Sequence, residues 1–88
     1  MSSEIWRVVV DASVRKALNN IPLADAAAVT FALAGLAANP YAGDIQKLKG
    51  EEAWRRRVRS YRVEFRIYQN MRTVLVYELK RRTSTTYR

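Results

Sequence analysis

The sequence has 88 residues, which is enough for one small domain. Apolar residues make up 49% of it and charged residues 27%, a balance typical of a globular chain rather than a disordered one. Because it contains no cysteine and no histidine, it excludes a disulfide scaffold, a metal site built on thiolate or imidazole ligands, and a serine–histidine triad. Any catalysis must therefore use Arg, Lys, Tyr or carboxylate side chains.

The positive charge is concentrated in the second half of the chain. Sixteen Lys and Arg against eight Asp and Glu give a net charge of +8. Residues 1–46 contain three basic and four acidic residues, whereas residues 47–88 contain thirteen basic and four acidic residues. This asymmetry predicts a polyanionic partner, either nucleic acid or an acidic protein.

The first half of the chain predicts a strand followed by two helices. Residues 5–10 are β-branched and aromatic and predict the strand. Asp11 or Ser13 can cap a short helix, which a proline ends. A second helix is predicted from about Leu23 to Ala38, because apolar residues recur there at helical spacing among many alanines. Two helices joined at a proline form a hairpin.

We expect a cytoplasmic chain with no membrane partner. The uncharged, alanine-rich segment of residues 26–38 is shorter than the roughly 20 residues that a membrane-spanning helix needs. The N-terminal residues also lack the basic start of a secretory signal.

From Ala53 onward, apolar and polar residues alternate with a period of two. Residues 54–59 and 61–68 predict two strands, residues 69–72 a turn, and residues 73–79 a last strand. Three consecutive strands with short links predict an antiparallel meander. The sequence therefore predicts one α+β domain over residues 1–88, in the order β-α-α-β-β-β, with a helical hairpin packed on one face of a small, mainly antiparallel sheet.

The alternation predicts a row of arginines on one face of this sheet, namely Arg55, Arg57 and Arg59 with Arg62 and Arg66 from the neighbouring strand. Guanidinium groups grip phosphate in a bidentate fork and stack on bases, which suits single-stranded RNA. A solvated outer face is the simpler interpretation of a basic run. However, like charges on neighbouring strands destabilise a sheet, so such a dense row of arginines indicates a functional role. By itself the row specifies only a polyanion.

The C-terminal residues 80–88 combine four basic residues with a penultimate tyrosine, Tyr87. This tyrosine can pack back on the sheet, or it can stack on a base and lend its hydroxyl to a phosphate. The carboxylates are too scattered for a metal site and there is no glycine-rich phosphate loop. We therefore expect neither a metal nor a cofactor.

The sequence resembles the RelE/ParE superfamily of bacterial toxins over nearly its whole length. The segments that carry the resemblance are Leu36 with Asn39-Pro40, Lys47-Leu48-Lys49-Gly50, Trp54-Arg55-Arg56-Arg57-Val58-Arg59, Tyr61-Arg62-Val63, and Arg81-Arg82 with Thr86-Tyr87. RelE-type members cleave mRNA in the ribosomal A site and are inhibited by an antitoxin encoded beside them. ParE-type members inhibit DNA gyrase on the same scaffold.

The resemblance also implies a site, residue by residue. It implies a catalytic set of Arg55, Arg57, Arg62, Arg81 or Arg82, and Tyr87. The RNA-binding residues expected beside this set are Lys47, Lys49, Arg59 and Arg66. ParE-type members usually lack the catalytic set, so its presence favours the nuclease. The lysine proposed as general base in some members is Arg57 here, and arginine is a poor base.

We therefore expect the toxin of a type II toxin–antitoxin system, a metal-independent endoribonuclease that depends on the ribosome. The ribose 2′-OH would attack the adjacent phosphate, and fixed positive donors would stabilise the developing charge. The expected partners are an acidic, RelB-like antitoxin, the ribosome and mRNA. The alternatives are a ParE-type gyrase inhibitor without nuclease activity, and an inert basic module that binds only an antitoxin.

Overall fold

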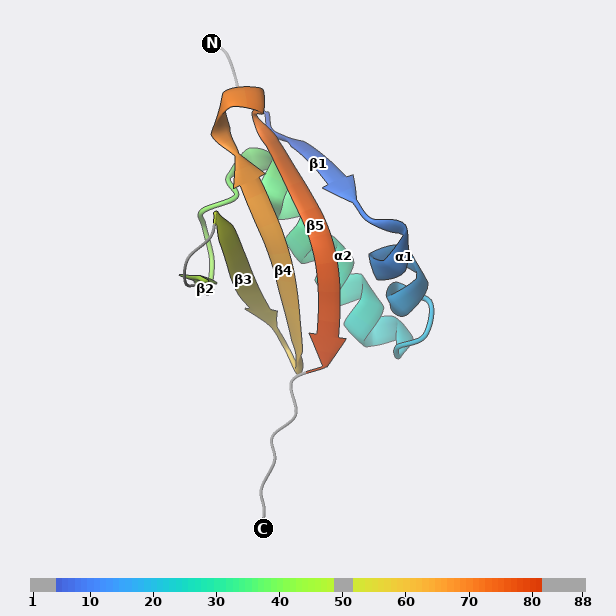
Figure 1. Ribbon diagram of the computed structural model, residues 1–88. Helices are drawn as coiled ribbons and strands as arrows, with labels where there is room; N and C mark the ends of the chain where they lie inside the picture. Colours follow the sequence, from blue (N-terminus) through green and yellow to red (C-terminus); the bar gives the residue numbers. More distant parts are fainter. Residues whose placement is uncertain (1–4, 49–51, 82–88) are drawn as a thin grey trace.

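The computed structural model describes residues 5–48 and 52–81 (Figure 1). Its sheet has the strand order β1-β5-β4-β3-β2, and the strands are β1 (Arg7–Val10), β2 (Ile45–Lys47), β3 (Ala53–Val58), β4 (Tyr61–Tyr68) and β5 (Thr73–Arg81). Strand β1 runs parallel to β5, and the other neighbours are antiparallel. The two helices are α1 (Ala12–Leu18) and α2 (Leu23–Ala38), and a short 3₁₀ turn, η1 (Gln69–Met71), joins β4 to β5.

Both helices lie on one side of the sheet, and the other side is open (Figure 1). The predicted α+β fold is therefore confirmed, including the bounds of the second helix. The sheet has one strand more than predicted, because the sequence predicts no strand at Ile45–Lys47, where the structure has β2. A segment this short has no period to detect, and its extended form comes from pairing with β3. Among the described residues, neither helix is long and apolar enough to cross a membrane.

The core lies between the helices and the sheet. Its fully buried side chains come from α1, α2, β4 and β5, and include Val14, Val29, Leu36, Val63, Phe65, Val74 and Val76. Burying each of these side chains stabilises the fold by about 1.5–3 kcal/mol. Because β4 alternates strictly between buried and half-buried residues, its arginines all face away from the helices. The core thus fixes which side of the sheet carries the positive charge.

Helix α1 begins at a capping residue, Asp11. The Asp11 carboxylate accepts hydrogen bonds from the Ser13 hydroxyl at 2.6 Å and from the Ser13 amide at 3.0 Å. Of the two capping candidates in the sequence, Asp11 is therefore the cap. These bonds favour the charged carboxylate, so the Ser13 hydroxyl, followed by the Ser13 amide, lowers the pKa of Asp11 below its usual value.

A β-bulge in β5 reverses the direction of the side chains that follow it. Glu64 pairs with Glu78 while Phe65 pairs with Val76, so Tyr77 is an extra residue between them. Before the bulge, Val76 faces the helices, and after it Leu79 packs against the core. Lys80 consequently faces the open side.

Candidate nucleic-acid interface

Three cations occupy directly opposite positions on three neighbouring strands of the open side. Arg57 of β3 pairs with Arg62 of β4, and Arg62 pairs with Lys80 of β5. Directly opposite residues in antiparallel strands share a face of the sheet. We call Arg57, Arg62 and Lys80 the cation row, and the side of the sheet away from the helices the open face.

One carboxylate, that of Glu64, forms ion pairs with two members of the cation row. The Glu64 Oε2 atom lies 3.7 Å from Arg62 Nη1 and 4.0 Å from Lys80 Nζ. The Glu64 side chain is only 13% exposed, whereas those of Arg62 and Lys80 are 34% and 52% exposed. Arg57 is different, because no described residue forms an ion pair or a side-chain hydrogen bond with it. The row therefore keeps an excess of positive charge that faces solvent.

At the edge of the open face, Arg55 and Arg57 line a hollow of about 270 Å³. Arg55 Nη2 donates a hydrogen bond of 2.6 Å to Gln46 Oε1, which holds this guanidinium in place. The Arg57 amide donates to the Asp44 carbonyl at 3.1 Å, which fixes the backbone beside the hollow. Positioned guanidinium groups around a small hollow suit a phosphate group.

Arg66 extends the positive charge along β4, away from the cation row. It pairs with Ala53 on one side and with Leu75 on the other, so it belongs to the open face. Its guanidinium carbon lies 5.6 Å from the centroid of the Tyr77 ring. Tyr68 is on the same face two residues further on. The open face thus combines guanidinium groups with aromatic rings, as surfaces that bind single-stranded nucleic acid do.

The structure places Arg59 away from this face, so the prediction that it lies beside Arg55 and Arg57 is wrong. Strand β3 ends at Val58, and Arg59 has a φ of 55° in the turn that follows. Its Nη1 atom donates to Asp25 Oδ1 of α2 at 2.9 Å, and the Tyr61 hydroxyl donates to Oδ2 at 3.3 Å. Alternation does not extend into a turn, and here Arg59 ties that turn to the helix.

Lys47 also lies on the helix side of the sheet. It pairs with Trp54, and its Nζ atom lies 5.9 Å from the centroid of the Trp54 ring. This placement cannot be predicted from the sequence pattern, because no strand is predicted at residues 45–47. Its neighbour in the basic motif, Lys49, lies outside the described residues.

The bulge decides which basic residue of β5 joins the open face. Arg81 pairs with Tyr61, whose ring is buried on the helix side, whereas Lys80 pairs with Arg62. Counting alternate residues from Val76 without the bulge would place Arg81 on the open face. The resemblance implied Arg81 or Arg82 at this position and did not include Lys80. The two other C-terminal residues of the predicted site, Arg82 and Tyr87, lie outside the described residues.

No protein-family model and no curated protein matches this sequence. Solved structures do match its fold. A chain of the archaeal RelE–RelB complex from Pyrococcus horikoshii superposes with a TM-score of 0.82 at 25% identity, covering 92% of this chain and 99% of that chain. The chain is RelE-like. The likeness confirms the resemblance to the RelE-type toxins and supports a type II toxin.

Two further RelE structures match this fold. A chain of the toxin–antitoxin complex RelBE2 from Mycobacterium tuberculosis matches the RelE-like chain with a TM-score of 0.76 at 25% identity, covering 92% of this chain and 95% of that one. The isolated RelE toxin of Escherichia coli matches with a TM-score of 0.77 at 14% identity, covering 91% and 87%. At that identity the match shows the fold alone.

Proposed function

We propose that the RelE-like chain is a type II toxin that binds translated mRNA on its open face and cleaves it. The observation that carries the proposal is the cation row, in which Arg57, Arg62 and Lys80 lie side by side with one shared carboxylate. Like charges directly opposite one another destabilise a sheet, so a row of three is costly for the fold alone. Binding a phosphate offsets that cost.

In the proposed reaction, the ribose 2′-hydroxyl gives its proton to solvent water as its oxygen forms a bond to the adjacent phosphorus, and the bond from phosphorus to the 5′-oxygen of the next nucleotide breaks. The products are a 2′,3′-cyclic phosphate and a free 5′-hydroxyl. Negative charge grows on the phosphoryl oxygens as the attack proceeds. Fixed donors directed at those oxygens stabilise this charge, and arginine serves well in this role.

Lys80 has a different part from the two arginines of the row. The arginine guanidinium stays protonated in proteins, whereas a lysine ammonium can release a proton. We therefore assign to Lys80 the proton that the leaving 5′-oxygen takes up. Glu64 holds Lys80 and Arg62 at a fixed distance from each other and so positions both.

The remaining residues of the proposed site bind and orient the RNA. Arg55 and Arg57 bind the RNA backbone at the hollow beside β2. Tyr87 and one of Arg81 and Arg82 are included on the resemblance alone, with the tyrosine orienting or stacking on the substrate.

We propose a RelB-like antitoxin as the protein partner. Two of the solved structures described above are complexes of a RelE toxin with its RelB antitoxin. An acidic segment that covers the open face would neutralise the cation row and exclude RNA from it. The toxin would act in the cytoplasm, where it meets ribosomes.

Primer extension on a translated message tests the nuclease. After induction of the chain we expect discrete new 5′ ends within the coding region, no such ends with Arg62→Ala, and poor cleavage of free RNA without ribosomes. Intact mRNA together with trapped gyrase and broken DNA would instead assign the chain to the ParE-type inhibitors.

A further inference from the structure

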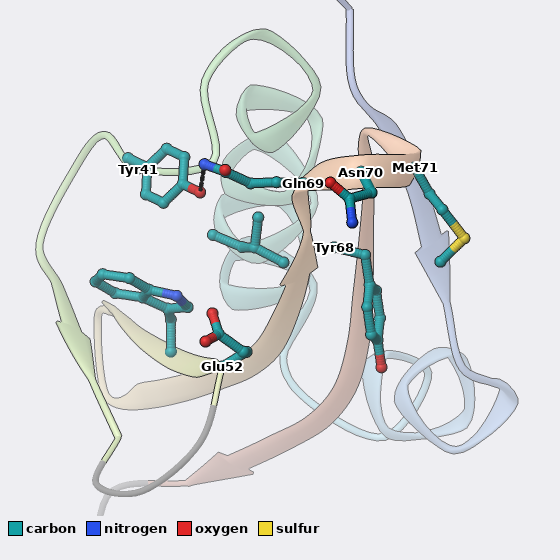
Figure 2. A pocket seen from close by; sticks show the side chains of 8 residues that line it. Tyr41, Glu52, Tyr68, Gln69, Asn70 and Met71 are labelled. Carbon is teal, nitrogen blue, oxygen red and sulfur yellow. Dashed lines mark hydrogen bonds between the residues drawn. The ribbon is translucent and has the colours of Figure 1, made fainter.

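A second cavity lies at the end of the sheet, where β4 extends beyond the start of β3. The last residues of β4, Ile67 and Tyr68, have no partner in β3, and the space beside them is a pocket of about 630 Å³. Pockets that hold small organic ligands have volumes of about 300–1,000 Å³. We call this cavity the end pocket, and Figure 2 shows the side chains around it.

One side of the end pocket is aromatic and rigid. The Tyr41 and Trp54 rings meet edge to face with their centroids 5.7 Å apart, and Trp6 packs on Tyr41 in the same way at 6.2 Å. The Tyr41 amide donates to Asn39 Oδ1 at 3.0 Å beside the fully buried Pro40, which fixes the loop that carries the ring. Ordered aromatic rings provide a surface on which a planar base can stack.

The rim of the end pocket also carries hydrogen-bonding groups, both donors and acceptors. Gln69 Nε2 donates to the Tyr41 hydroxyl at 2.7 Å, so the hydroxyl hydrogen of Tyr41 remains available to donate (Figure 2). The Glu52 carboxylate reaches toward the same space and can only accept (Figure 2). Asn70 lies exposed beside them. The pocket therefore presents an acceptor pair and a donor around an aromatic surface.

This set of groups matches the Watson–Crick edge of guanine. Guanine presents two adjacent donors, N1–H and N2–H, which one carboxylate can accept together, and a neighbouring acceptor, O6, which a hydroxyl can reach. Adenine, cytosine and uracil each present an acceptor where guanine presents one of the two donors. Reading an unpaired base by stacking and by its Watson–Crick edge is the usual mode in single-stranded RNA recognition.

The charges around the end pocket fit an RNA strand that also crosses the open face. Lys47 Nζ lies 5.9 Å from the Trp54 ring centroid, close enough to the pocket for its ammonium to reach a phosphate. Along β4, Arg66 lies between the cation row and Tyr68 at the mouth of the pocket. The seven residues from Arg62 to Tyr68 lie along one strand. Six strand steps between them span roughly 20 Å, a distance that a few nucleotides cover.

We propose that the end pocket binds an unpaired guanine of the RNA whose phosphate lies on the cation row. This inference rests on the proposed function, because it treats the substrate of the open face as RNA. In this proposal Glu52 and Tyr41 select guanine over the other bases. Lys47 contacts the RNA backbone on the helix side of the sheet.

Nucleotide binding to the purified chain tests the pocket without any cleavage. We expect GMP to shift the NMR signals of the Trp54 indole N–H and the Gln69 carboxamide in a saturable way, and to bind about tenfold more tightly than AMP, CMP or UMP. Glu52→Gln should abolish this preference, and Tyr41→Phe should reduce it while stacking persists. The matched control is Glu78→Gln, the same change on the open face, which should keep the preference for GMP.

Equal binding of all four nucleotides, or no shift at Trp54 and Gln69 with any of them, overturns the guanine assignment. Cleavage mapping then separates this inference from the nuclease. If the message is cut but GMP does not bind, the end pocket is not a base site and the nuclease stands. If GMP binds and no message is cut, the end pocket stands as a guanine site and the nuclease is wrong.

Discussion

The Arg62 guanidinium and the Lys80 ammonium share the Glu64 carboxylate, and the three groups lie together on the open face. If catalysis there is mainly electrostatic, the loss of one donor costs about 10²–10³ in rate. We therefore expect Arg62→Ala and Lys80→Ala each to slow cleavage by about this factor in a ribosome-programmed assay. Arg81→Ala should cost less, because Arg81 pairs with Tyr61 on the helix side.

The matched control for these variants is Arg15→Ala on helix α1, which removes an arginine from the helix side of the sheet and should leave the cleavage rate unchanged. A severe loss in Arg81→Ala together with full activity in Lys80→Ala would contradict the register of β5 as the basis of the site.

Lys80→Arg separates charge from proton transfer. The substitution keeps a cation on the row and removes a group that can release its proton. We expect RNA affinity to stay within about twofold of the parent, while the single-turnover cleavage rate falls by about 10²-fold, the lower end of the range for general acid catalysis. Parental cleavage by this variant would show that Lys80 acts by its charge alone.

These residues also show how far the sequence predicts the site. Alternation along β4 correctly predicts that Arg62 and Arg66 share a face, because that strand is regular from end to end. Simple alternation fails after Tyr77, because the bulge adds one residue there. Lys80 therefore lies on the open face and Arg81 on the helix side, the reverse of what alternation alone predicts. Alternation fails again at Arg59, where an ion pair with Asp25 in a distant helix turns the side chain away. The predicted roles themselves stay predictions.

At the scale of elements, the sequence predicts the long, periodic segments and does not predict the short strand β2. Helix α2 and strands β3, β4 and β5 have enough residues to repeat a pattern. Strand β2 has three, and its geometry depends on its partner in β3. The misplacement of Lys47 follows from this, since without a strand there is no register to count.

The cap of α1 gives a prediction for stability. The folded state lowers the pKa of Asp11 through the hydrogen bonds from Ser13, so the carboxylate stabilises the fold above its unfolded pKa, and this contribution is lost as the pH falls through the folded value. We expect Asp11→Ala to lower the melting temperature by a few degrees at pH 7. The difference in melting temperature between Asp11→Ala and the parent should become smaller as the pH falls below about 4.

Ser13→Ala is the control for the cap, because it removes the hydroxyl bond and keeps the amide bond to Asp11. Thermal unfolding followed by circular dichroism should show a smaller loss than for Asp11→Ala. A difference between Asp11→Ala and the parent that is the same at pH 3 and pH 7 would mean that the charge of Asp11 does not contribute.

At the scale of the whole molecule, the two sides of the sheet have separate tasks. The helices cover one side and build the core there, which leaves the open face free to carry charge that a core could not tolerate (Figure 1). A domain of this size has little stability to spare, and a neutralising partner would relieve the repulsion between the cations. Toxin inhibition and stabilisation would then have the same electrostatic origin.

This view predicts how an acidic antitoxin binds. Because steering by opposite charges is screened by salt, the association rate should fall as the ionic strength rises, while the dissociation rate changes less. Arg57→Glu reverses a charge of the open face and should slow association with the antitoxin by about tenfold at low salt. Arg15→Glu makes the same reversal on the helix side and should have little effect. Stopped-flow kinetics over a range of salt concentrations would measure both variants, and a larger effect of Arg15→Glu would place the antitoxin on the helices instead of the open face.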